Sequence, residues 1–262
     1  MAKGNSKGAG AGVPAVRKQG TAVVSMKELM EKQAAQIADK IGSPGGDRIA
    51  VSQDKSFKFP DGTITKDPFQ AIIVEFVTGH FYYAGKYDPK NIVPPDCFAL
   101  GEDPDAMVPS ENSPQKQADN CQDCALNQFG SDGAGKACQN RRVLALLPPD
   151  ALDKKEERGE DEPLAIISVS PTALRNFDGY VAKLANMAKK PPAAFITTIG
   201  FNSRVDYAQL VFTNPEIIED EALLAHVFSR QDEARARLLT EPDVTARPAP
   251  TPKAQPRRGA RR

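Results

Sequence analysis

The sequence predicts a mainly β domain of the α+β class, in which an open barrel or sheet is accompanied by one inserted helix and by a helix at each end. Three observations favour this prediction. Short apolar or alternating runs recur through the middle of the chain, a run with helical spacing comes late among them, and no crossover helices alternate with the strands. An OB-like open barrel or sheet fits these observations better than a βαβ arrangement does.

The first predicted elements are a helix at about 25–41 and a long strand over 70–83. A capping box that starts at Ser25 begins the helix, and a glycine-containing segment after residue 41 ends it. A short alternating run at 57–59 precedes the long strand. The long strand is apolar on both faces, which is typical of a central strand, and Gly79 is expected to bend or bulge it.

Two further strands, 141–147 and 164–169, are expected to pair antiparallel. The highly charged stretch 153–162 between them is predicted to be a solvated hairpin tip. A helix then begins at Ser170, where Pro171 suits the first turn, and its apolar stripe predicts a buried face.

The last predicted elements are two strands, 194–201 and 207–212, and a third helix that begins at Asn214-Pro215. The buried stripe of this helix is expected to contain Ile217, Leu224, Val227, Phe228 and Leu238.

The charges are unevenly distributed, although the formal net charge is +0. Residues 1–20 carry +4 and residues 242–262 carry +5, which leaves −9 on residues 21–241. We therefore expect one domain at 21–241 with a disordered basic tail on each side, either available to polyanions or merely solubilising. No apolar run suits a membrane span and no secretory signal is present, so a soluble cytoplasmic protein is predicted.

All four cysteines lie in one quarter of the chain, with the spacing C-x23-C-x2-C-x13-C. A C-x2-C turn presents two thiolates to one zinc ion, and the other two ligands can come from distant loops. We predict that Cys97, Cys121, Cys124 and Cys138 hold one structural Zn²⁺ and form a zinc-stapled loop. Buried free thiols, disulfides and an iron–sulfur cluster are the alternative interpretations of the same residues.

The chain is not predicted to be an enzyme. Its two histidines, His80 and His226, fall in a strand and in a helix, where a lone histidine usually packs or lies on the surface. The loop 130–136 lacks the phosphate-loop pattern, because Ala137 follows its lysine.

Aromatic and basic residues gather at the end of the long strand and in the cysteine loop. Bases of single-stranded DNA stack on aromatic faces while cations contact the phosphates, often on an OB-like sheet. Because side chains alternate along a strand, Phe81 and Tyr83 should point away from Tyr82. The predicted contacts with single-stranded DNA are Tyr82, Tyr87, Lys86, Phe129, Lys136, Arg141 and Arg142.

Several segments between about 70 and 213 also carry a resemblance. They are Pro94-Pro95-Asp96-Cys97-Phe98, Cys121-Gln122-Asp123-Cys124, Asn127-Gln128-Phe129-Gly130-Ser131, Gly135-Lys136-Ala137-Cys138, Ser170-Pro171-Thr172-Ala173-Leu174 and Phe177-Asp178-Gly179-Tyr180. Together they resemble a group of bacteriophage proteins described as zinc-containing single-stranded-DNA-binding proteins. The resemblance implies an OB fold, a role in phage DNA replication or recombination beside the proteins of those processes, and no catalysis.

The basic C-terminus departs from the acidic docking tail that replicative single-strand binders commonly have. Two other functions stay open. One is a zinc-stapled transcription-regulatory or interaction protein without a preference for single-stranded DNA, and the other is an enzyme whose site the sequence does not reveal.

Overall fold

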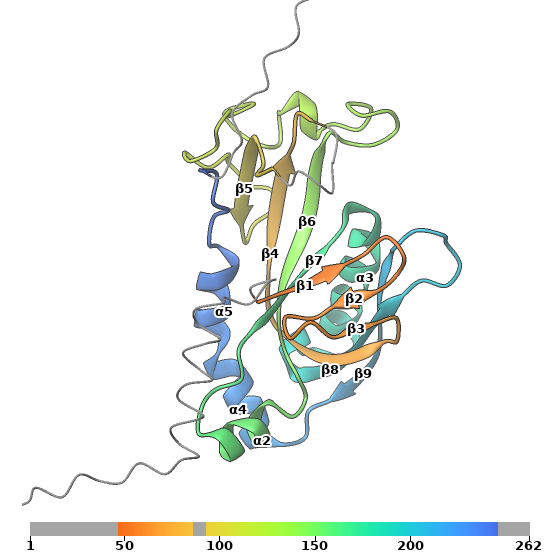
Figure 1. Cartoon of the computed structure of the whole chain (residues 1–262), viewed down its shortest axis with the longest axis vertical. Helices are drawn as coiled ribbons and strands as arrows, with labels where there is room; N and C mark the ends of the chain where they lie inside the picture. The colour runs from red at the N-terminus through yellow and green to blue at the C-terminus, as the bar shows by residue number, and fades with distance from the viewer. Residues whose placement is uncertain (1–46, 86–92, 246–262) are drawn as a thin grey trace, which may run out of the picture. The chain divides into compact units, whose positions relative to one another are not determined.

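The computed structural model describes residues 47–85 and 93–245, which form a mostly β, curled half-barrel sheet with a few helices (Figure 1). The predicted helix at 25–41, the tail at 1–20 and most of the tail at 242–262 lie outside the described residues. Among the helices of the described ranges, none is long and apolar enough to cross a membrane.

The strands are β1 (Arg48–Val51), β2 (Phe57–Lys58), β3 (Ile64–Thr65), β4 (Phe69–Tyr82), β5 (Cys97–Gly101), β6 (Cys138–Leu147), β7 (Ala165–Val169), β8 (Phe195–Phe201) and β9 (Leu210–Ile217). The helices are α2 (Ala151–Arg158), α3 (Leu174–Lys183), α4 (Glu221–Ser229) and α5 (Gln231–Leu238), with short helical turns η1 (Ala125–Asn127), η2 (Pro171–Ala173), η3 (Leu184–Ala188) and η4 (Pro192–Ala194). The strand order is β3-β2-β1-β7-β6-β4-β8-β9, and β5 also pairs with β4. Neighbouring strands are antiparallel except β1 and β7, which are parallel.

The long strand β4 occupies the centre of the sheet, as its apolar faces predicted. One of its edges pairs with β6 from Ile72 to Tyr82. The other edge is shared, because β8 pairs with Phe69 to Ile72 and β5 pairs with Thr78 to Tyr82. Three strands therefore form backbone hydrogen bonds with this single strand.

The irregularity in β4 lies at Val74 and not at Gly79, where the sequence led us to expect it. The pairing with β6 shifts between Ile73 and Glu75, so Val74 is the extra residue of a β-bulge. Gly79 stays in regular register, and its lack of a Cβ makes room for a ring, since a Cβ there would lie 2.5 Å from the Phe81 side chain. The bulge changes which later residues of β4 share a face.

We call the two sides of the sheet the α3 face and the α5 face, after the helices that cover them. On the α3 face, Ala71, Ile73 and Phe76 of β4 pack in one core with α3. Phe177 of α3 is fully buried there, and its ring meets those of Phe76 and Phe212 edge-on, with centroids 5.2 and 5.0 Å away. The predicted second helix thus packs through the face that its sequence indicated.

The sheet curls because the β2–β3 hairpin turns toward β8. The ring of Phe57 in β2 stacks on Phe201 of β8, with centroids 4.3 Å apart. The Lys55 ammonium before β2 also donates to the carbonyl of Asn202 at 3.3 Å. These contacts join opposite ends of the strand order and give the half-barrel its curvature.

The α5 face holds a second core, which α2, α4 and α5 cover. Its β4 residues are Ile72, Val74 and Val77, and α5 lies against β4 and β6. Figure 1 shows α5 running beside β4. Because α5 ends at Leu238, the last residues of β4 continue beyond the helix on this face.

The charged stretch 153–162 is not a simple hairpin tip, although β6 and β7 pair antiparallel as predicted. It forms most of α2, which begins at the fully buried Ala151 and ends where Gly159 adopts a left-handed φ of 73°. The sheet therefore carries two inserted helices, α2 and α3. The local charge pattern concealed α2 because only one turn of it contacts the core.

The predicted third helix is also wrong at its start. The chain continues as β9 through Ile217, because β8 supplies a pairing partner as far as Phe195. Two helices, α4 and α5, follow, and the Asp220 carboxylate caps α4 by accepting from the amide of Ala222 at 2.8 Å. Consequently Ile217 and Phe228 are 42% and 41% exposed and do not belong to a buried stripe.

Replacing Phe177 with Ala should lower the free energy of unfolding by about 3–5 kcal/mol, because it removes a fully buried ring from the α3 face. Urea denaturation measures this change. The matched control Phe228→Ala removes an exposed ring and should cost much less. Equal losses in the two variants would contradict the placement of α3 in the core.

Candidate functional site

Cys97 and Cys138 are brought to one face of the sheet by the strands on either side of β4. Tyr82 of β4 is in register with Cys97 of β5 on one edge and with Cys138 of β6 on the other. Residues in register on antiparallel strands point to the same face. Two cysteines 41 residues apart in the chain therefore flank one tyrosine on the α3 face.

The C-x2-C turn is held by hydrogen bonds from residues around it. The amide of Cys121 donates to the Met107 carbonyl at 3.0 Å. The buried Asn127 fixes both ends of the turn, since its side-chain amide donates to the Cys121 carbonyl at 2.6 Å and its backbone amide to the Cys124 carbonyl at 2.9 Å. A polar network thus orders this turn, beside a small apolar cluster in which Cys121 packs with Ala99 and Met107.

The loop that carries the turn is fastened to β5. The amide of Ser110 donates to the Phe98 carbonyl at 2.8 Å, and the amide of Gln115 donates to the Asp96 carbonyl at the same distance. We call the segment from Pro94 to Cys138 the cysteine module. Its fold places Cys121 and Cys124 opposite the two strand cysteines.

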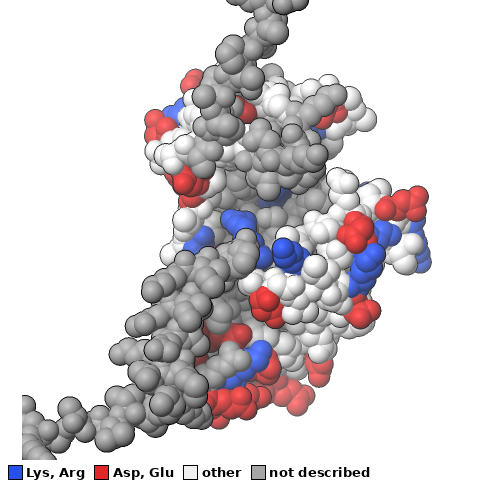
Figure 2. All heavy atoms as spheres, viewed as in Figure 1, with Lys and Arg blue, Asp and Glu red and all other residues white. Residues whose placement is uncertain are grey.

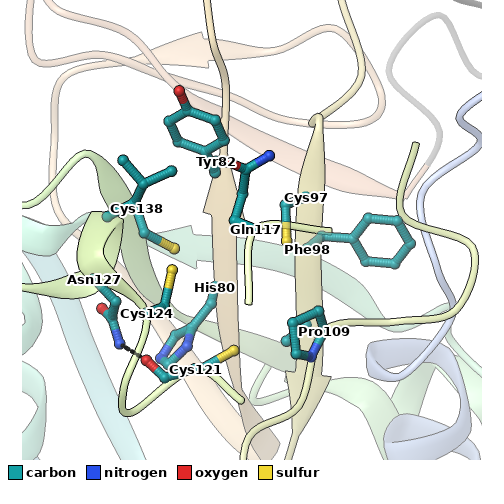
Figure 3. A pocket seen from close by; sticks show the side chains of 12 residues that line it. His80, Tyr82, Cys97, Phe98, Pro109, Gln117, Cys121, Cys124, Asn127 and Cys138 are labelled. Carbon is teal, nitrogen blue, oxygen red and sulfur yellow. Dashed lines mark hydrogen bonds between the residues drawn. The ribbon is translucent and has the colours of Figure 1, made fainter. Parts of the chain in front are cut away.

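All four cysteines are free and buried, and they line one cavity of about 20 Å³ together with His80, Tyr82 and Asn127 (Figure 3). Such a volume accommodates about one water molecule, and therefore an object of the size of a single ion. As they stand, no three His, Cys, Asp or Glu side chains of residues 47–85 and 93–245 are grouped tightly enough to hold a metal ion. Coordination would require the four sulfurs to draw inward toward the cavity.

The electrostatics of the cavity suit a soft cation. Burial raises the pKa of Cys121 to about 11 and that of Cys138 to about 12, and the neighbouring thiols add to both shifts. Without a cation the Cys121 and Cys138 thiols are therefore neutral at physiological pH. A bound divalent ion would remove the repulsion between thiolates and displace their protons, so its affinity should rise with pH. Four sulfur donors are the set that zinc takes in structural sites.

His80 is the residue of this site that the sequence analysis missed. It is 5% exposed, it lies two residues before Tyr82 on the same face, and its Nδ1 has no hydrogen-bond partner in the described part of the chain. Burial, aided by Lys136 and Arg142, lowers the pKa of His80 to about 4, so the imidazole is neutral. A neutral imidazole could donate a hydrogen bond to one of the thiols, or it could bind a metal ion beside them. The only sign of its role in the sequence was its position two residues before Tyr82, which places both side chains on the same face of the strand.

The exposed Phe129 and the half-buried Lys136 form a pair on the glycine-rich loop of the cysteine module. Phe129 is 81% exposed, and the Lys136 ammonium lies 5.0 Å from the centre of its ring. The same ammonium donates to the Asn127 side-chain carbonyl at 3.3 Å, which links the pair to the C-x2-C turn. Gly130 has a φ of 93°, which an L side chain rarely adopts, so the loop keeps this shape through its glycines.

The other predicted DNA contacts are distributed differently. Tyr82 is half-buried and lines the cysteine cavity. Arg141 points to the α5 face, over the Phe81 ring. The guanidinium of Arg142 is engaged on the α3 face, where it donates to the Asp178 carboxylate at 3.1 and 3.3 Å and to the Thr78 hydroxyl at 2.8 Å.

The predicted residues Lys86 and Tyr87 lie outside the described residues. The structure thus brings Tyr82, Phe129 and Lys136 together around the cysteine module, and it separates Arg141 and Arg142 by the thickness of the sheet. Comparison of the chain with family models, curated proteins and solved structures finds no match. What the protein does is therefore argued from its own residues.

We expect one zinc ion per chain in protein purified without chelators, and Cys124→Ser should lower this stoichiometry and destabilise the fold, because metal binding and folding are linked. Elemental analysis and thermal unfolding measure the two effects. Ala125→Ser changes the exposed neighbouring residue and should leave both unchanged. A stoichiometry near zero in the unaltered protein would refute the zinc prediction.

Proposed function

We propose that the chain is a non-enzymatic single-stranded-DNA-binding protein, with an OB-like sheet and one structural zinc held by its four cysteines. It would coat and protect single-stranded DNA during replication or recombination in the cytoplasm, which is the host cytoplasm if a phage encodes it. The observation that carries the proposal is the exposed Phe129 ring, held beside the Lys136 ammonium at the end of a curled β sheet. The replication and phage assignments rest on the sequence resemblance alone.

An exposed aromatic ring beside a cation suits a nucleic acid strand. Every base offers a flat face for stacking, so a fixed ring binds without regard to sequence, and the ammonium can contact the adjacent phosphate. The Phe129 ring is 81% exposed, and exposure of apolar surface to water is unfavourable. A base stacked on the ring would remove part of this surface from water. A double helix offers few unstacked bases, so this arrangement favours single strands.

The proposed zinc ion would have only a structural role in this surface. Cys97 and Cys138 belong to strands, whereas Cys121 and Cys124 belong to the turn that Asn127 holds. An ion shared by all four would fix the turn to the sheet. Because Lys136 also contacts Asn127, the ion would also fix the orientation of the Phe129–Lys136 pair.

The second candidate function is a zinc-stapled transcription-regulatory or interaction protein. It is favoured by Val108, which is 61% exposed on the same module as Phe129. Two exposed apolar side chains on one module suit a protein partner as well as a nucleic acid. The first function requires that the chain by itself bind single-stranded DNA, whereas the second function does not.

The unaltered protein should bind oligo(dT) more tightly than duplex DNA of the same length, and Phe129→Ala should weaken binding to oligo(dT) by about 5- to 150-fold, the equivalent of one stacked base. Fluorescence anisotropy at several salt concentrations measures both. Lys136→Ala should instead reduce the dependence of the affinity on salt, because a phosphate contact releases counterion.

Met187→Ala is the matched control, because it removes a 75% exposed apolar side chain outside the cysteine module. It should bind as the unaltered protein does. Absence of any preference for the single strand would refute the proposed function and favour the interaction protein.

A further inference from the structure

A groove lies on the α5 face, on the side of β4 opposite the cysteine cavity. Its volume is about 400 Å³, which is within the range of about 300–1,000 Å³ typical of sites for organic ligands. The residues that line it include Arg48, Phe81, Tyr83, Arg141, Leu238 and Asp243. We call it the aromatic groove, after Phe81 and Tyr83.

The groove exists because α5 ends before β4 does. Val77 is covered by the helical core of the α5 face, but beyond Leu238 no helix of the described residues covers the sheet. Phe81 and Tyr83, which alternate with Tyr82, therefore remain half-buried and not fully enclosed. Gly79 leaves space for the Phe81 ring, so this ring lies close over the strand as part of the groove floor.

Two arginines give the groove a positive charge. The Arg141 guanidinium lies 5.6 Å from the centre of the Phe81 ring, and its Nε is buried without a hydrogen-bond partner in residues 47–85 and 93–245. Arg141 also donates to the side chain of Gln139, which is neutral. Arg48 of β1 is exposed and forms no ion pair within the described ranges. Figure 2 shows several Lys and Arg side chains gathered near the middle of the view.

Among the described residues that line the groove, only Asp243, at the C-terminal side, carries a carboxylate. It accepts hydrogen bonds from the amide and the hydroxyl of Thr245, at 2.8 and 2.6 Å. The segment that carries it is tied to the cysteine module, because the Glu241 carboxylate accepts from the side chains of Ser110 and Asn112. This connection makes residues 240–243 one wall of the groove.

We infer that the aromatic groove is the main path of the bound single-stranded DNA, with a base stacked on Tyr83 above the groove floor and phosphates on Arg48 and Arg141. The inference rests on the proposed function and specifies its site. It is favoured by charge complementarity, since two arginines without a carboxylate partner face a polyanion, and by the half-buried Tyr83 ring, which offers a stacking face. A protein partner or a membrane would not require both features at one site. The bound DNA would thus lie on the face of the sheet opposite Tyr82.

The first test compares substitutions inside and outside the groove by oligo(dT) titration at several salt concentrations. Tyr83→Ala should weaken binding by about 5- to 150-fold, through the loss of one stacked base. Arg48→Gln and Arg141→Gln should each reduce the slope of log affinity against log salt by about 0.7. Asp243→Asn should tighten binding, because it removes a negative charge beside the phosphates.

Tyr207→Ala and Arg204→Gln are matched controls on the loop between β8 and β9, where both residues are exposed, and they should bind as the unaltered protein does. Urea denaturation of each variant separates loss of binding from loss of folding. A second readout needs no variant: oligo(dT) that carries 5-iodouracil should cross-link under light to the peptide that contains Phe81 and Tyr83.

The outcomes distinguish the two proposals. If the groove variants are folded and bind normally while Phe129→Ala loses affinity, the protein binds single strands elsewhere and the groove inference is wrong. Cross-links confined to the cysteine module would lead to the same conclusion. If the unaltered protein shows no preference for oligo(dT) over duplex DNA, the proposed function fails and the groove inference fails with it.

Discussion

The pairing of β4 with three other strands is the constraint on which the rest of the structure depends. β6 occupies one edge of β4, while β8 and β5 divide the other edge between its two halves. Because the first half of β4 is apolar on both sides, it can be stable only with helices packed on both faces. α3 and α5 fulfil this requirement, and the β-bulge at Val74 sets which residues each helix meets.

The last residues of β4, from His80 on, extend beyond these helices and carry the candidate site on both faces. His80 and Tyr82 point to the cysteine cavity, whereas Phe81 and Tyr83 point to the aromatic groove. The two surfaces therefore share one strand and are back to back. An ion bound by the cysteines would stiffen the strand end that forms the groove floor, and Glu241 links the cysteine module to the groove wall. A metal centre without catalytic function would in this way control the shape of a binding surface.

The distribution of charge matters more here than its total. Residues 21–241 carry −9, yet the groove contains two arginines and one carboxylate. Elsewhere several of the basic residues described are neutralised, as when Arg142 pairs with Asp178 and Arg235 with Glu75. An acidic body keeps the protein from binding polyanions over its whole surface, so local arrangement decides where a nucleic acid strand could bind.

The sequence by itself determined the elements whose signals are local. The apolar faces of 70–83 predicted the central strand, the runs 141–147 and 164–169 predicted an antiparallel pair, and the clustered cysteines predicted one shared site. Only the tertiary structure decided the bulge at Val74, the extension of β9 past Asn214 and the helix α2, because each depends on a partner that is distant in the chain. The same reason applies to the candidate site. The strand register decides that His80 shares a face with Tyr82, and the ion pair with Asp178 decides that Arg142 is neutralised while Arg141 is not. Neither the register nor the ion pair is encoded in the spacing of neighbouring residues.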